Sequence, residues 1–201
     1  MAEWFRQYWM YAVALVVVCI AASFIFKKAA TAYRAHQKSF HEDEAMMRHL
    51  VELKNKYQNL TEEIILSAPD EELLEGTALS YQLKLQKKED LSKEFSLLSK
   101  EKQYVYALDV FVSDGSAKKF FKENGSELIS IIAPAFEAIG LTQYGDTVKK
   151  LATMFDKKDE TVSLNYKLVE EADKKFAEDD ILTKIKLEGA RYIKNSPELF
   201  I

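Results

Sequence analysis

Carboxylates are the chemically active side chains that this sequence offers, because histidine and cysteine are nearly absent. The three histidines, His36, His41 and His49, all precede residue 62 and lack the spacing of a helical zinc-binding pair. The single cysteine is Cys19, and residues 62–201 contain neither residue type. A Ser-His-Asp or Cys-His nucleophile and a soft metal site therefore cannot be built in that region.

The acidic residues could support carboxylate-only hydrolysis or a magnesium site, with Asp109, Asp114 and Glu137 as candidates. A further acidic run at 178–180 directly precedes a helix with apolar periodicity, where carboxylates stabilise the positive end of the helix dipole. The six glycines are scattered singly, so neither a P-loop nor a dinucleotide-binding loop is present. We expect no catalytic site, no metal and no cofactor, and a carboxylate-based enzyme is the least favoured alternative.

The net charge differs in sign between two parts of the chain. Residues 1–61 carry eight Lys and Arg against five Asp and Glu, whereas residues 62–201 carry 20 against 27. A helical domain with this acidic excess is soluble and repels nucleic acid, so we expect no direct nucleic-acid binding. The partner that we expect is a protein of unknown identity.

The composition predicts an all-α protein. Glycine and proline number six and three, and no long stretch alternates apolar and polar residues as a strand would. We expect a short N-terminal tail at 1–8, a transmembrane helix at 9–26, a juxtamembrane stalk helix at 27–66 and a soluble, compact multi-helix domain at 67–201.

The predicted anchor, WMYAVALVVVCIAASFIF at 9–26, carries no charge and would cover roughly 27 Å as a helix. It predicts a single-pass membrane protein; a cleaved signal peptide and a buried helix are the alternatives. The expected lipid contacts are Trp9, Leu15, Val17, Ile20, Phe24 and Phe26.

Positive charges flanking a span tend to stay cytoplasmic, and those after the anchor outnumber Arg6 before it. We therefore expect a cytoplasmic C-terminal domain, with an extracytoplasmic domain as the alternative. The charges that set this orientation are Lys27, Lys28, Arg34 and Lys38.

An apolar stripe marks the second half of the stalk, at alternating spacings of four and three residues. It suits either a coiled coil that pairs two copies of the chain or packing on the domain that follows. It covers fewer than three heptads, which slightly favours packing on the domain. The stripe consists of Met46, Leu50, Leu53, Tyr57, Leu60 and Ile64.

Caps and apolar periodicity divide residues 67–201 into helices. Ser67 is expected to cap a helix that runs to about residue 88. Further helices are expected from about 99 to a turn at 114–116, around 120, and at 126–140, 142–155, 161–176 and 179–195. Gly140 suits a left-handed helix end, and Pro134 predicts a kink or a break. A set of aromatic residues could line a groove, although this spacing is more typical of a core: Tyr104, Tyr106, Phe111, Phe120, Phe121 and Phe136.

Five short segments after residue 62 resemble a bacterial DNA-mimic protein family: YALDV at 106–110, DG at 114–115, FFKENG at 120–125, AFEAIG at 135–140 and YIKNSPELF at 192–200. The family's Asn-Gly-Gly turn reads DGS at 114–116 here, and its glutamine-aromatic pair reads KFF at 119–121. The resemblance implies an all-helical domain. In the best-known member, surface carboxylates imitate the phosphates of duplex DNA. That implies an acidic face here, made of Asp156, Asp159, Glu160, Glu170, Glu171, Asp173, Glu178, Asp179 and Asp180.

Lysines interleave with the carboxylates of this domain, as at Lys84, Lys118 and Lys122, and they reduce the field that phosphate mimicry requires. We therefore predict a membrane-tethered protein-protein interaction module without catalytic activity. A second copy of the chain, bound through the stalk, is a further candidate partner. A DNA-mimic domain that occupies a DNA-binding protein is the alternative.

Overall fold

A computed structural model describes residues 44–86, 91–154 and 166–201, and the chain divides into two units, Met1–Val51 and Glu52–Ile201. The described residues form helices joined by turns, with no strand among them, so the all-α prediction is confirmed for this part of the chain. The predicted anchor at 9–26 and the charges that follow it lie outside these ranges. Within them, no helix is both long enough and apolar enough to cross a bilayer.

Residues 44–57 are helical, and the boundary between the two units falls within this stretch. In the described part of the first unit, Met46, Met47 and Val51 are exposed. The elements of the second unit are α2 (Glu62–Ser67), α3 (Asp70–Leu85), α4 (Leu91–Ser96), α5 (Lys100–Asp114), α6 (Ala117–Glu123), α7 (Ser126–Ala138), α8 (Thr142–Ala152), α9 (Tyr166–Glu178), α10 (Ile181–Asn195) and a 3-10 helix, η1 (Pro197–Leu199).

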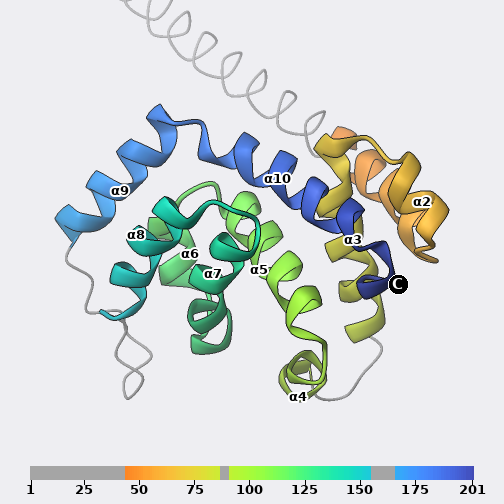
Figure 1. The fold of residues 1–201 in the computed structure, drawn as a ribbon, viewed down its shortest axis with the longest axis horizontal. Coiled ribbons are helices and arrows are strands. Elements are labelled where there is room, and N and C mark those ends of the chain that lie inside the picture. Colours follow the sequence, from red (N-terminus) through yellow and green to blue (C-terminus); the bar gives the residue numbers. More distant parts are fainter. Residues whose placement is uncertain (1–43, 87–90, 155–165) are drawn as a thin grey trace, which may run out of the picture. The chain divides into compact units, whose positions relative to one another are not determined.

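Helix α5 is the element around which the second unit is arranged, since it packs against α3, α6, α7 and α10. In Figure 1, α10 lies along α3 and α5, whereas α7 and α8 lie side by side. The Ser99 hydroxyl caps the start of α5 by accepting a hydrogen bond from the Lys102 amide, and Gly115, with φ +73°, ends the helix. Both ends of this central helix are therefore set by local sequence signals.

An aromatic cluster around Phe111 forms the centre of the core. The Phe111 ring centroid lies 5.3 Å from those of Phe120 in α6 and Phe136 in α7, and 6.1 Å from that of Phe176 in α9. All four rings are buried, as is Phe121. Tilted and edge-to-face ring pairs of this kind are favourable beyond the area that they bury. These phenylalanines therefore belong to the core, and Phe111 and Phe176 also border a cavity of about 100 Å³.

The predicted stalk stripe divides between surface and core. Its first residue, Met46, is exposed, and Leu50 is half-buried. Its later members lie in the core of the second unit or pack against it: Leu53, Tyr57, Leu60 and Ile64. These later side chains pack within the chain itself. Their burial agrees with the alternative interpretation, in which the stripe packs on the domain that follows.

The stalk is also not one helix up to residue 66, because the chain turns at 58–60. Thr61 starts α2 there, and its hydroxyl accepts a hydrogen bond from the Ile64 amide over 3.3 Å. No proline or glycine marks this break in the sequence. The turn lets Leu60 and Ile65 reach the same core as Tyr57, and this burial outweighs local helix propensity.

One expectation about helix ends differs from the structure, and of the kink or break predicted at Pro134 the break is absent. Pro69, not Ser67, is the N-cap of α3, and the Ser67 hydroxyl instead donates to the Glu63 carbonyl oxygen within α2. Helix α7 continues through Pro134 without a break. Ser130, whose carbonyl loses its helical donor to this proline, is exposed, so water can replace that donor. Gly140 has φ +80° and ends α7 as predicted.

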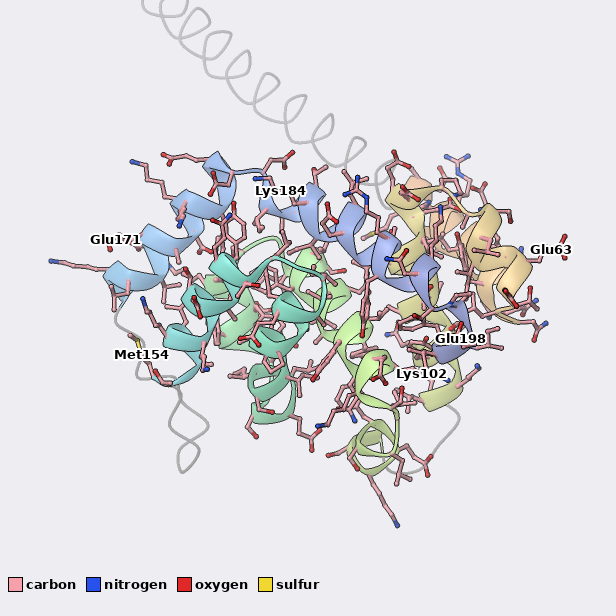
Figure 2. All side chains as sticks on the ribbon, viewed as in Figure 1. Glu63, Lys102, Met154, Glu171, Lys184 and Glu198 are labelled. Carbon is pink, nitrogen blue, oxygen red and sulfur yellow. The ribbon has the colours of Figure 1, made fainter. Side chains whose placement is uncertain are left out.

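The C-terminal residues close the side of the unit formed by α3 and α5. Phe200 is buried, and its carbonyl oxygen accepts a hydrogen bond from the Tyr81 hydroxyl over 2.9 Å. The Lys102 ammonium donates to the Ile201 carbonyl oxygen over 2.7 Å, and Figure 2 shows Lys102 near the segment that carries Glu198. These contacts connect α3, α5 and the end of the described chain.

A close approach joins Tyr57 to α3 at Gly76. A Cβ placed on Gly76 would lie 2.4 Å from the nearest atom of the Tyr57 ring, and the Tyr57 hydroxyl donates to Glu72 Oε1 over 2.8 Å. Gly76→Ala should therefore force this ring to move and lower the free energy of unfolding by about 1–3 kcal/mol, as overpacked cores do. Urea denaturation of the purified chain would measure the change.

The matched control is the same substitution in a Tyr57→Ala background. With the ring absent, Gly76→Ala should be neutral or stabilising, because alanine is favoured over glycine inside a helix by about 1 kcal/mol. An equal loss in both backgrounds would contradict the assigned contact.

Candidate functional site

An open groove lies between the C-terminal end of α3, α4, the first half of α5 and the start of α7. It has a volume of about 370 Å³. Figure 1 shows α4 at the same end of the unit as the later turns of α3 and the first turns of α5. The lining residues combine apolar side chains with amides, hydroxyls and one carboxylate: Gln82, Leu85, Gln86, Ser92, Phe95, Tyr106, Glu127 and Leu128.

The short helix α4 is held in place by Gln103 of α5. The side-chain amide of Gln103 donates to the carbonyl oxygens of Phe95 and Leu98, over 3.2 and 3.0 Å. These carbonyls lie at the end of α4 and just after it, where Gln103 adds to the one backbone bond that the Phe95 carbonyl accepts from the Leu98 amide over 3.1 Å. The Phe95 ring then packs on Tyr106, with centroids 5.3 Å apart and ring planes tilted by 57°. Gln103 therefore positions the aromatic floor of the groove.

The polar rim of the groove comes from three helices. Gln82 lies in the last turn of α3, and Gln86 is the C-cap residue one turn further on; both are exposed. Glu127, in the first turn of α7, accepts a hydrogen bond from the Ser92 hydroxyl of α4. Burial, followed by the charge of Asp109, raises the pKa of the Tyr106 hydroxyl, so this group remains a neutral hydrogen-bond donor.

A group of charged residues meets where α3, α5 and α10 pack together. Burial, and secondarily the negative charge of Glu75 in α3, raises the pKa of Asp109 in α5 to about 8, despite the opposing charge of Lys186 in α10. Asp109 follows Tyr106 by one helical turn but is not among the residues that line the groove. Sequence reasoning named Asp109 as a candidate without any sign of this raised pKa, because the cause is packing between distant segments.

Of the other carboxylate candidates, Asp114 has structural partners and Glu137 is exposed. Asp114 accepts a hydrogen bond from the Asn124 side-chain amide over 2.7 Å and pairs with the Lys119 ammonium at 3.3 Å. Glu137 is exposed on α7, and His49 is exposed before the second unit. In the described ranges, no three His, Cys, Asp or Glu residues are grouped so that they could hold a metal ion.

The predicted acidic face is described in part, because Asp156, Asp159 and Glu160 lie outside the described residues. Two of its described members make ion pairs. Glu170 lies 3.6 Å from the Lys118 ammonium, and Glu178 lies 3.8 Å from the ammonium of Lys174 on the same helix.

The remaining members extend from the middle of α9 to the start of α10. Asp179 accepts a hydrogen bond from the buried Tyr144 hydroxyl over 3.0 Å. Asp180 has φ +48° between α9 and α10 and accepts from the Thr183 hydroxyl over 3.1 Å. Glu171 is exposed, and Figure 2 shows it on the outer side of α9. Most of the described carboxylates of this face thus interact with their own chain.

Asp173 of α9 caps α6, since its two carboxylate oxygens accept hydrogen bonds from the amides of Ala117 and Lys118, over 2.6 and 3.2 Å. The carboxylate satisfies amides that have no partner within α6 and complements the helix dipole.

Comparison of the chain with protein-family models, with curated protein sequences and with solved structures finds no significant match. The candidate site therefore rests on the groove itself. Of its lining residues, Tyr106 was singled out from the sequence, and the others were not. Phe95 offers one sequence signal, because it is an isolated aromatic residue in the polar stretch at 86–96.

Asp109→Asn should flatten the pH dependence of stability. The folded chain retains the Asp109 proton up to about pH 8, whereas the unfolded chain releases it near pH 4. The resulting stabilisation is complete below about pH 4 and is lost as the pH rises to about 8, at no more than about 1.4 kcal/mol per pH unit. Urea midpoints at acidic, neutral and mildly alkaline pH would measure it.

The matched control for this prediction is Asp146→Asn, at an exposed position of α8. It should follow the wild-type pH profile, whereas Asp109→Asn should be more stable than wild type above about pH 8. Parallel profiles for all three proteins would show that Asp109 is not protonated in the folded chain at neutral pH.

Asp173→Ala should lower the free energy of unfolding by about 1–3 kcal/mol, because two backbone amides lose a charged acceptor. Glu171→Ala, on the same helix at an exposed position, should change it by less than about 0.5 kcal/mol. Thermal unfolding followed by circular dichroism compares the two. Equal effects would argue against a capping role for Asp173.

Proposed function

We propose that the chain is a membrane-tethered protein-protein interaction module. Residues 9–26 would anchor it in a lipid bilayer, and the helical domain would bind a protein at the cytoplasmic surface. The observation that carries this proposal is the groove between α3, α4, α5 and α7. Its volume of about 370 Å³ falls within the usual range of binding sites, and it combines an apolar floor with a few polar groups at the rim.

The side chains of the groove are of types that bind more readily than they react. Amides, hydroxyls and aromatic rings supply hydrogen bonds and apolar contact, and the one carboxylate, Glu127, has no second acid or base beside it among the described lining residues. This composition supports an interaction role over a carboxylate-based hydrolase.

The predicted anchor supports the same role, because it would raise the local concentration of the domain at the membrane surface. The uncharged run at 9–26 and the positive charges after it are typical of a span with a cytoplasmic domain. A domain held at a surface meets other membrane-bound proteins at a raised effective concentration, so that a modest groove affinity suffices.

The described acidic residues give less support to DNA mimicry. Asp173 caps α6, Asp179 accepts from Tyr144, and Glu170 pairs with Lys118. Carboxylates that are engaged within the chain present a weaker field to a basic partner than an array of open charges does.

A photoreactive amino acid in place of Gln86, at the groove rim, should crosslink a discrete protein partner in native membranes. The same residue in place of Glu171 on α9 should not, because this position does not line the groove. Leu128→Asp should reduce the crosslink formed from position 86, since it places a charge against the apolar floor. Mass spectrometry of the crosslinked species provides the measurement.

The two positions also separate the two functions. A basic, DNA-binding protein captured from position 171 and not from position 86 would support mimicry and overturn the groove proposal. Protease added to intact cells should leave the domain uncut, because a cytoplasmic domain is shielded by the membrane. Digestion of the domain from outside would overturn the cytoplasmic orientation.

A further inference from the structure

We infer that the groove binds a peptide segment in which a large apolar side chain lies next to a lysine or arginine. This inference rests on the proposed function and names the class of segment that the partner would present. It follows from the apolar floor, the position of the charge at the rim and the spacing of the rim amides.

The floor is suited to one large apolar side chain. Phe95 and Tyr106 place two tilted rings side by side, and Leu85 and Leu128 add aliphatic surface from α3 and α7. A volume of about 370 Å³ accommodates such a side chain together with the adjoining backbone. Burial of a leucine or phenylalanine side chain removes a large apolar area from water, which favours a segment with such a residue.

Glu127 provides the charge complementarity. Among the described residues that line the groove, it is the one with a formal charge, and it is exposed. The Ser92 hydroxyl donates to Glu127 Oε1 and so orients the carboxylate. A carboxylate has acceptor positions beyond this one bond, and a lysine or arginine on the bound segment can use them. A segment with an acidic residue at that place would be repelled.

The side-chain amides of Gln82 and Gln86 can form hydrogen bonds with the backbone of such a segment. Each primary amide has an acceptor oxygen and two N–H donors, and the two side chains follow each other by one turn along the rim. An extended peptide exposes both carbonyl and amide groups for them. A purely apolar small molecule would form no hydrogen bond with these amides or with Glu127, and a phosphate-bearing ligand would be repelled by Glu127.

Blocked tetrapeptides test the inference on the full chain reconstituted in phosphatidylcholine nanodiscs. The probes are acetyl-Gly-Leu-Lys-Gly-amide, the same peptide with glutamate for lysine, and the same peptide with glycine for leucine. Saturation-transfer NMR reports binding. The leucine-lysine peptide should bind at least about threefold more tightly than the leucine-glutamate peptide, the scale of an exposed ion pair.

Glu127→Lys should reverse this preference. Glu123→Lys is the matched control, because it makes the same change in net charge at an exposed position of α6 that does not line the groove. It should leave the preference for lysine intact. A reversal in Glu127→Lys alone supports the inference.

Two outcomes would overturn the inference. If the lysine and glutamate peptides bind equally well and the glycine peptide does not bind, the charge preference is wrong, while a groove that binds apolar segments stands. If no peptide binds although position 86 captures a protein, the partner does not use a short linear segment, and the proposed function survives without this inference.

Discussion

The packing around Phe111 is the constraint on which the rest of the second unit depends. Rings from α6, α7 and α9 each contact this one side chain, so these helices can approach α5 only at a fixed register. Close-packed interiors leave little room for alternatives. Phe136 holds α7 near its C-terminal end, and the first turn of that helix, with Glu127 and Leu128, lies at the opposite end and borders the groove.

Local signals in the sequence were sufficient for much of the helical organisation. Ser99, Gly115 and Gly140 act at short range, through a hydroxyl cap or a left-handed backbone, and their effects do not depend on distant residues. The same holds for the periodicity of α5 and α10. All-α class and most helix positions could therefore be predicted, although Ser67 as a cap and a break at Pro134 could not be judged without their surroundings.

The groove could not be predicted in the same way, because it combines segments that are far apart in the sequence. Gln86 and Phe95 approach Tyr106 and Leu128 only after α3, α4, α5 and α7 have packed. The turn at 58–60 and the raised pKa of Asp109 have the same origin, since both depend on burial against other elements. Neither spacing nor composition carries that information, which arises from tertiary contact.

The packing of Tyr57 against α3 determines how the core responds to tension on the preceding chain. Leu53 and Tyr57 are buried, and the Tyr57 ring lies against Gly76 of α3. The packed core therefore begins directly after residue 52. An extended linker would absorb tension by lengthening, up to about 3.4 Å per residue. Here a pull on the chain ahead of Leu53 acts on the packed interior itself. Tension on this part of the chain is therefore resisted by the burial of Leu53 and Tyr57 and not by the lengthening of a linker.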